Sequence, residues 1–207
     1  MPERSPGPRS RSSTLDTIYI HADESCLDNQ NQKRSSPGGA GGLLEIWRDG
    51  AWERRDYWLS EADTTNNRMA LQSALEPLRA LKRRCRIVFT SDSQYLVRGL
   101  NEWRHGWKRA QWKRKAGAIK NLDLWRALDA AVDRHDFTAV WVRGHHGHAE
   151  NEYVDFLATR AAAEQSRSGG LVPSGFPAWL DEQREKGEYL DYMEFQAPAD
   201  RYGDPSA

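Results

Sequence analysis

Cysteine is scarce in this chain, and long apolar runs are missing from it. Cys26 and Cys85 are its two cysteines. They are too few for a disulfide scaffold and lack metal-ligand spacing, so we expect reduced thiols. No apolar run approaches the roughly 18 to 20 residues that cross a bilayer, and residues 1–13 lack the apolar core of a secretory signal. These absences predict a cytoplasmic protein without a membrane partner.

Net charge is also absent, because 30 Lys and Arg residues balance 30 Asp and Glu residues. The balance conceals a strong asymmetry along the chain. Residues 103–120 hold seven basic residues and no acid, whereas residues 178–207 hold eight acids and three basic residues. A basic segment in a neutral protein predicts a polyanionic partner that binds at one place on the surface.

The composition suffices for one folded domain with polar extensions. A hydrophobic content of 38%, nine tryptophans and a mean hydropathy of −0.85 are typical of a soluble chain with a core. Residues 1–15 are rich in Pro, Ser and Arg, which favours a flexible arm. We expect a monomeric domain over residues 16–165. The C-terminal extension, residues 166–207, is expected either to dock as a helix or to stay loose.

Short β-rich runs open the expected domain. Strands are predicted over residues 15–22, 42–48 and 52–59, with a long polar loop over residues 25–42. The dipeptide Asp49-Gly50 separates the second and third strands and favours a type I′ hairpin turn. These features predict an antiparallel meander.

A different periodicity begins near Asn67, where apolar residues recur at three and four positions as in an amphipathic helix. Thr65 or Asn66 is a plausible N-cap for this helix, which reaches Leu81. Further helices are predicted over residues 93–99, 122–135 and 150–164, and further strands over residues 86–90 and 138–142. This alternation predicts an α/β domain that has a mixed sheet with helices on its faces.

Three aspartates stand where such a sheet would expose them at one edge. Asp23 ends the first strand, Asp92 follows the strand over residues 86–90, and Asp155 lies on the last helix. Any one of them alone is more typical of a solvated turn or cap. The surrounding sequence decides between these interpretations.

Six segments match, in order and spacing, the motifs of one known family. They are HADESCLDN (21–29), TTNNRMAL (64–71), TSDSQYLVRG (90–99), WRHGWKRAQWKRK (103–115), KNLDLW (120–125) and WVRGHHGHAENEYVD (141–155). Over residues 16–163 the chain resembles the type 1 ribonuclease H family. The resemblance implies a ribonuclease H-like fold with a mixed five-stranded sheet, in which parallel strands follow three antiparallel ones. It also implies endonucleolytic hydrolysis of the RNA strand of RNA/DNA hybrids.

The family's chemistry uses two Mg²⁺ ions about 4 Å apart, which stabilise the attacking and leaving oxygens together. The resemblance implies that Asp23 bridges both ions, that Asp92 holds the ion carrying the nucleophile, and that Asp155 holds the other; Mn²⁺ is a possible substitute. His145 corresponds to a histidine that assists proton transfer or product release. A solvated turn or zinc binding is the alternative for this histidine-rich loop.

Ala70 departs from the family pattern, because similar proteins have a catalytic glutamate there. Glu24, directly after Asp23, stands where the family has glycine. One hypothesis is that the carboxylate has been relocated, which makes Glu24 a candidate catalytic residue and metal ligand. Adjacent strand residues point to opposite faces, so this requires the strand to end or bulge at Glu24. The alternatives are a residual three-carboxylate enzyme and a hybrid-binding protein with little activity.

The basic segment resembles the protrusion that grips the DNA strand in some family members, although its tryptophans are equally consistent with core packing. Its candidate residues are Trp103, Trp107, Lys108, Arg109, Trp112, Lys113, Arg114 and Lys115. Thr65 and Asn121 match a DNA phosphate pocket, which the nearby acid Asp63 would disfavour. Residues that match contacts to the minor groove or to 2′-OH groups are Asn29, Asn66 and Gln94. We therefore expect sequence-independent binding of an RNA/DNA hybrid. A transposase-like nuclease is a third interpretation, but it leaves the basic segment unexplained.

Overall fold

A single mixed sheet organises the computed structural model, which describes residues 15–27, 36–114, 117–144 and 148–193. The strand order is β5-β4-β1-β2-β3-β6. The strands are β1 (Thr17–Cys26), β2 (Ser36–Arg48), β3 (Ala51–Thr64), β4 (Arg86–Ser91), β5 (Asp136–Trp141) and β6 (Val172–Pro173). Strands β1 to β3 form the predicted antiparallel meander, and β4 and β5 continue the sheet in parallel beside β1. The mixed α/β architecture is therefore confirmed.

The strand number and several strand ends differ from the prediction: β1 runs to Cys26, past the predicted end near Asp23, and β3 runs to Thr64. The sheet has six strands rather than five, because the two-residue strand β6 pairs with the edge strand β3. Strand β2 begins at Ser36, within the predicted loop, because its glycines lie where no side chain fits. A Cβ on Gly41 would lie 2.7 Å from the backbone nitrogen of Ala158, and one on Gly42 would lie 2.2 Å from the ring of Tyr57. Close packing requires these glycines, whereas their composition alone is typical of a loop.

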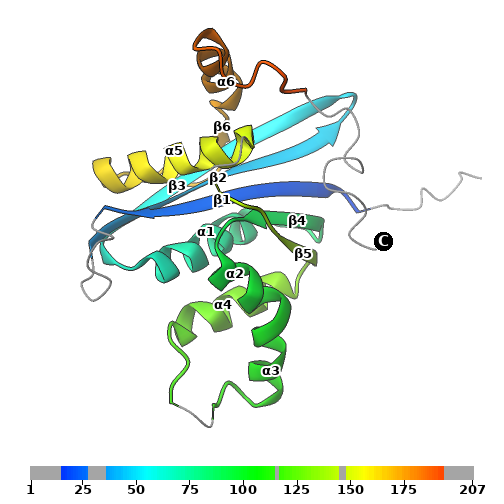
Figure 1. Cartoon of the computed structure of the whole chain (residues 1–207). Coiled ribbons are helices and arrows are strands. Elements are labelled where there is room, and N and C mark those ends of the chain that lie inside the picture. The colour runs from blue at the N-terminus through cyan, green and yellow to red at the C-terminus, as the bar shows by residue number, and fades with distance from the viewer. Residues whose placement is uncertain (1–14, 28–35, 115–116, 145–147, 194–207) are drawn as a thin grey trace, which may run out of the picture.

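Helices cover both faces of the sheet, as predicted (Figure 1). One face carries α5 (Ala149–Glu164), with α6 (Phe176–Glu185) beyond it. The opposite face carries α1 (Asn66–Ala80), α2 (Gln94–Arg98), the π-helical turn η1 (Gly99–Trp103), α3 (Arg104–Arg109) and α4 (Leu122–Val132). None of the helices in the described ranges is long and apolar enough to span a membrane.

One turn and one helix cap form as the sequence predicts. Asp49 and Gly50 both have positive φ, at 52° and 81°, as a type I′ turn requires. Thr65 is the N-cap of α1, where its side chain accepts a hydrogen bond from the backbone N–H of Arg68.

The residues of β1 alternate between two separate faces of the sheet. Ile20, Ala22 and Cys26 face α1 and join the main core. His21 points to the other face, where it pairs with Glu45. This alternation is the ordinary period of two along a strand, and it assigns every second residue of β1 to one face.

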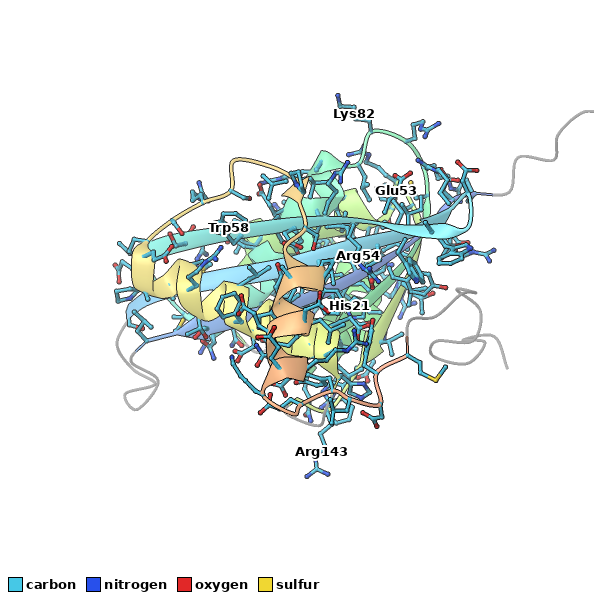
Figure 2. All side chains as sticks on the ribbon, turned by 90° about the horizontal axis from the view of Figure 1, so that it is seen from above. His21, Glu53, Arg54, Trp58, Lys82 and Arg143 are labelled. Atoms are coloured by element: carbon cyan, nitrogen blue, oxygen red, sulfur yellow. The ribbon has the colours of Figure 1, made fainter. Side chains whose placement is uncertain are left out.

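The C-terminal extension docks on the α5 side of the sheet. The carboxylate of Asp56 accepts hydrogen bonds from the Tyr153 hydroxyl at 2.6 Å, the Ser174 hydroxyl at 2.6 Å and the Gly175 N–H at 2.8 Å. Phe176 is 1% exposed and belongs to a second core that includes Tyr153. Seen from above, α6 crosses the sheet close to His21 and Arg54 (Figure 2). Residues 194–207 lie outside the described part of the chain.

Candidate active site

The site lies where β1 extends past the end of β4. Parallel pairing between the two strands ends at His21 and Thr90, yet β1 continues along β2 as far as Cys26. Asp23 and Glu24 therefore pair with β2 on one side, whereas on the β4 side the sheet has a gap beside them. The chain that leaves β4 turns at this gap and contains Asp92.

Asp23 is the centre of a group of carboxylates. Its side chain is buried, and burial is the main cause that raises the pKa of Asp23 to about 9. The negative charges of Asp92 and Glu24, and to a smaller extent that of Asp155, raise the pKa of Asp23 further. A hydrogen bond from the Glu24 backbone N–H to Oδ1 of Asp23, 2.7 Å long, opposes them. The fold thus brings four carboxylates, from β1, α5 and the turn after β4, close enough for their charges to interact.

Glu24 is the second perturbed member of this group. Burial first, and the charge of Asp92 second, raise the pKa of Glu24 to about 8, while a hydrogen bond with the Ser93 side chain lowers it. One carboxylate oxygen, Oε2, is buried and has no hydrogen-bond partner among the described residues. A buried carboxylate oxygen without a partner is unfavourable unless something else pairs with it.

Glu24 lies on the same face of the sheet as Ala70, the position at which the family resemblance predicts glutamate. Alternation along β1 puts Glu24 on the face of Ala22 and Cys26, which pack in the main core with Ala70. Strand β1 neither ends nor bulges at Glu24, because pairing with β2 is continuous from Ile18 to Cys26, so the end or bulge that the relocation hypothesis required is not observed. Asp23 and Glu24 point to opposite faces of the sheet, and the charge of Asp92, which follows β4, acts on both of them.

Carboxylate oxygens are the ligands that a hard divalent cation prefers, and the group supplies them from four side chains. Within the ranges that the structure describes, no three His, Cys, Asp or Glu side chains have the close geometry of a completed metal site. The expected sites at His145, Asn29 and Lys115 lie outside the described residues. At the start of α1, Oδ1 of Asn66 is buried and has no hydrogen-bond partner in the described part.

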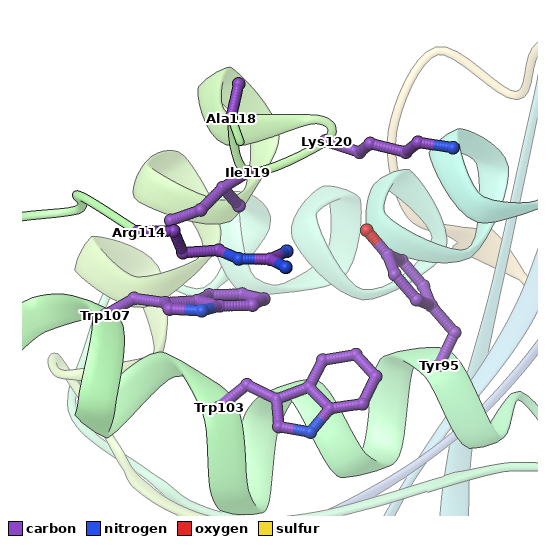
Figure 3. A pocket seen from close by; sticks show the side chains of 7 residues that line it. All are labelled: Tyr95, Trp103, Trp107, Arg114, Ala118, Ile119 and Lys120. Carbon is purple, nitrogen blue, oxygen red and sulfur yellow. The ribbon is translucent and has the colours of Figure 1, made fainter. Parts of the chain in front are cut away.

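The basic segment forms a pocket of about 570 Å³ beyond the main core (Figure 3). It is lined by Tyr95, Trp103, Trp107, Arg114, Ala118, Ile119 and Lys120. The core-packing interpretation holds for two of the tryptophans, and two line the pocket. Trp107 and Trp112 pack against the main core, whereas Trp103 and Trp107 also line the pocket. The side chain of Arg114 lies over the ring of Trp107.

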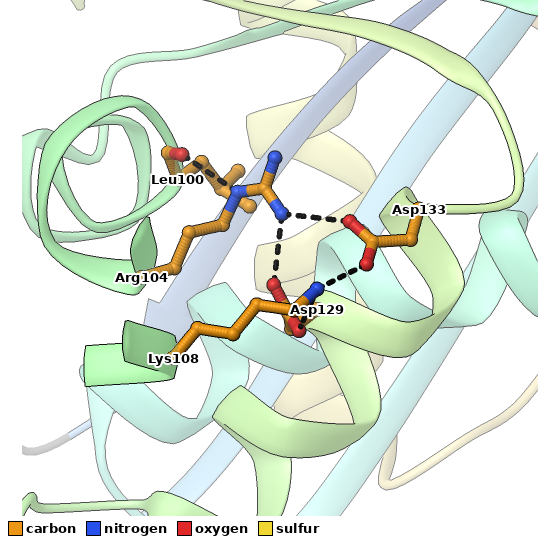
Figure 4. Close-up of polar contacts among 5 residues, drawn as sticks. All are labelled: Leu100, Arg104, Lys108, Asp129 and Asp133. Atoms are coloured by element: carbon orange, nitrogen blue, oxygen red, sulfur yellow. Dashed lines mark hydrogen bonds and ion pairs between the residues drawn. The ribbon is translucent and has the colours of Figure 1, made fainter. Parts of the chain in front are cut away.

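Two cations of this segment are engaged within the protein (Figure 4). Arg104 lies 2.8 Å from Asp129 and 3.1 Å from Asp133, and Lys108 lies 3.1 Å from Asp129 and also pairs with Asp133. These contacts tie α3 to α4. They also compensate the charge of Lys108, which was predicted to bind nucleic acid. Arg109, Lys113 and Arg114 remain exposed.

The other predicted binding residues lie outside the carboxylate group and do not line the pocket. Thr65 and Gln94 are exposed at the starts of α1 and α2, and Asp63 is exposed at the end of β3. Asn121 precedes α4 with a positive φ of 56° and donates to the Tyr95 hydroxyl at 3.5 Å. Sequence reasoning missed Ser93 and Tyr95, although each lies within three residues of Asp92.

An α/β sheet that gathers four carboxylates where β1 runs past the end of β4, together with a basic, aromatic pocket, is typical of a metal-dependent enzyme acting on a polyanion. Comparison with known proteins identifies the class more closely. A family model, RNase H, matches residues 16–163. Ribonuclease HI of Neisseria meningitidis serogroup A is 46% identical over 151 residues, which cover 72% of this chain and 98% of that protein.

Ribonuclease H of Pseudomonas entomophila is 45% identical over 150 residues, covering 72% of this chain and 95% of the relative. Among solved structures, LC9-RNase H1 is described as a type 1 RNase H with the type 2 active-site motif. It matches with a TM-score of 0.77 and 42% identity, over 93% of this chain and 98% of that one. The chain belongs to the ribonuclease H family. It is an endoribonuclease that hydrolyses the RNA strand of RNA/DNA hybrids, and its family depends on divalent metal ions.

Proposed function

We propose that this ribonuclease H performs its cleavage with a relocated glutamate, so that Asp23, Glu24, Asp92 and Asp155 form the catalytic set. The observation that carries this proposal is the position of Glu24, on the face of Ala70 and close enough to Asp92 for their charges to interact. The related LC9-RNase H1, a type 1 enzyme with the type 2 active-site motif, supports it. A type 1 ribonuclease H can evidently carry another motif.

The residues present fit divalent metal ions, and two Mg²⁺ ions, replaceable by Mn²⁺, are our proposal. Carboxylates that raise one another's pKa are relieved of this repulsion when a cation lies among them. The unpartnered Oε2 of Glu24 supplies a further oxygen ligand. When bound, the ions would activate the attacking water and stabilise the leaving 3′ oxygen. Asp23, on which the charges of Asp92, Glu24 and Asp155 all act, would contribute oxygen ligands to the ions.

Hybrid binding follows from the surface beyond the carboxylates. Arg109, Lys113 and Arg114 are exposed on the basic segment, and we assign them to the phosphates of the DNA strand. Trp103 and Trp107 offer ring faces in the adjoining pocket. Phosphate and ring contacts carry no base sequence, so the proposed binding is sequence-independent.

Further expectations complete the proposal. Thr65 and Asn121 bind a DNA phosphate, and Asn66 and Gln94 contact the hybrid near the cleaved strand. Proton transfer or product release by His145, a cytoplasmic location and a monomeric state remain part of the proposal.

Removal of the Glu24 carboxylate tests the relocation. The intact chain should cleave a labelled RNA/DNA hybrid with Mg²⁺ or Mn²⁺, and leave single-stranded RNA and duplex DNA uncut. Glu24→Ala should reduce this cleavage by at least about 100-fold, because loss of a direct metal ligand should cost no less than loss of a group that only supports a ligand. Glu53→Ala is the matched control, because Glu53 is exposed at the hairpin end of β3, far from the site (Figure 2).

Restoring the carboxylate at the family position gives a second arm. The double variant Glu24→Ala/Ala70→Glu should cleave faster than Glu24→Ala, because both positions supply the same face of the sheet. Wild-type cleavage rates in Glu24→Ala would reject the relocation and leave a three-carboxylate enzyme. Hybrid binding without any cleavage by the intact chain would favour a hybrid-binding protein instead.

A further inference from the structure

Asp92 is held from outside its own strand. It follows Ser91, the last residue of β4, whose partner in β5 is Trp141. The indole N–H of Trp141 donates a hydrogen bond of 3.0 Å to the backbone carbonyl of Asp92. The backbone N–H of Val142 donates to the carbonyl of Ser91 at 3.2 Å, which closes the β4–β5 ladder just before the turn. The end of β5 thus fixes the backbone on which Asp92 stands.

The exposure of Trp141 indicates that its hydrogen bond to Asp92, rather than burial, accounts for the tryptophan. Its side chain is 46% exposed, so the ring contributes less to the core than a buried tryptophan would. A hydrogen bond to a carbonyl at the site explains a tryptophan here better than burial does. Phenylalanine would supply nearly the same apolar surface without the N–H.

The same segment reaches the carboxylate of Asp92 three residues later. A Cβ on Gly144 would lie 2.3 Å from Oδ2 of Asp92, closer than any real contact allows. The φ of Gly144 is outside the left-handed region, so backbone conformation does not require glycine at this position. The space that a side chain would occupy is the space of the Asp92 carboxylate.

The position of Asp92 matters to the whole group. Its charge is the largest single charge effect on both Asp23 and Glu24, so it lies close to both carboxylates of β1. A displacement of Asp92 would change its distance to both. Outer hydrogen bonds that orient a ligand commonly decide how tightly a metal is held.

We propose that Trp141 and Gly144 are positioning residues for Asp92. Trp141 anchors its backbone carbonyl through the indole N–H, and Gly144 leaves room for its carboxylate. This inference rests on the proposed function, since it assumes that Asp92 is a metal ligand. It adds that the end of β5 and residues 142–144 set the geometry of the carboxylate group.

Mn²⁺ binding to the full chain without substrate tests the inference, with free Mn²⁺ measured by electron paramagnetic resonance. Trp141→Phe should bind Mn²⁺ about 10-fold more weakly than the wild type, the lower end for removing a hydrogen bond to a metal ligand. Trp47→Phe is the matched control, because Trp47 lies near the hairpin, at the opposite end of β2 from the residues that pair with Asp23. Thermal unfolding of both variants should remain close to that of the wild type.

Gly144→Ala provides an arm that does not depend on Trp141. It should also weaken Mn²⁺ binding and raise the Mn²⁺ concentration needed for half-maximal hybrid cleavage. Wild-type Mn²⁺ affinity in both variants, or an equal weakening in Trp47→Phe, would overturn the inference. A wild-type chain that neither binds Mn²⁺ nor cleaves the hybrid would instead overturn the proposed function, so the two failures are distinguishable.

Discussion

His135 is a buried side chain whose ionisation differs between the folded and unfolded chain. Its Nδ1 accepts a hydrogen bond of 3.3 Å from the backbone N–H of Cys85. Burial, with the nearby charges of Arg134 and Arg84, lowers the pKa of His135. The neutral ring is therefore the form that the folded protein favours.

This shift predicts a stability that depends on pH. The unfolded chain takes up the proton near pH 6.5, above the pH at which the folded chain does. The contribution of neutral His135 to stability is complete above the pKa of the unfolded chain, about 6.5. It is lost as the pH falls from that pKa to the lower pKa of His135 in the folded chain. Urea unfolding between pH 8 and pH 5.5 should therefore show a larger decrease in stability for the wild type than for His135→Asn, which keeps an acceptor near Nδ1.

Other groups titrate in both the wild type and His135→Asn, so the difference between their pH dependences of stability isolates His135. His105→Asn, a change at an exposed position of α3, should keep the wild-type dependence on pH. Equal pH dependence in His135→Asn and the wild type would contradict the assignment.

Between elements, the ion pairs of α3 and α4 connect the basic segment to the domain. The side chain of Asp129 is 8% exposed and pairs with Arg104 and Lys108, whereas that of Asp133 is 46% exposed. Removal of a buried, charged hydrogen-bond partner is costly because it leaves the other group desolvated and unpaired. Exposed ion pairs are screened by water.

The two aspartates should therefore differ in their effect on stability. Asp129→Ala is expected to lower the free energy of unfolding by about 2 kcal/mol, and Asp133→Ala by less than about 1 kcal/mol. Urea denaturation of the full chain measures both. Similar decreases in the two variants would mean that solvent screens the whole network equally.

The polypeptide between α2 and α3 shows how neighbouring elements constrain each other. A Cβ on Gly99 would lie 2.0 Å from the ring of Trp125, so the helix can pass α4 only with glycine there. The π-helical turn η1 begins at this residue. A π-turn shifts the following residues around the helix axis. Helix α3 follows this shift. Its Trp107 lines the pocket, and its Arg104 forms an ion pair with Asp129 of α4.

For the whole molecule, the zero net charge hides a localised basic surface. Phosphate neutralisation releases counterions, so hybrid affinity should fall as salt rises. Lys113→Ala/Arg114→Ala should weaken binding of a catalytically silent hybrid complex, measured in Ca²⁺ or EDTA by fluorescence anisotropy. The slope of log K against log salt should become shallower by about one for each phosphate that the variant no longer neutralises.

Lys82→Ala/Arg83→Ala is the matched control. It removes the same charges from the exposed loop before β4, at the other end of that strand from Asp92. This control should leave the slope unchanged. Equal slopes in both double variants would show that net charge, rather than the basic surface, governs binding.

Much of the architecture was predictable because it depends on local periodicity. The period of two in β1, the helical period after Asn67 and the Asp49-Gly50 turn all express backbone geometry that neighbouring residues determine. Strand β6 and the start of β2 were not predictable. Val172 and Pro173 form a strand only because β3 presents an edge to them, and the glycines of β2 are explained only by the approach of α5 and of the Tyr57 ring.

The candidate site divides in the same way. The sequence by itself determined the family, the acidic residues and the presence of Ala70 and Glu24 where the family resemblance predicts glutamate and glycine, because motifs and residue identities are local properties. The tertiary structure alone decided that β4 ends before β1 does, and that Asp92 lies close enough to Asp23 and Glu24 for their charges to interact. It also decided that Trp141 holds Asp92 and that Asp133 engages Lys108, because distances between remote residues depend on how strands and helices pack.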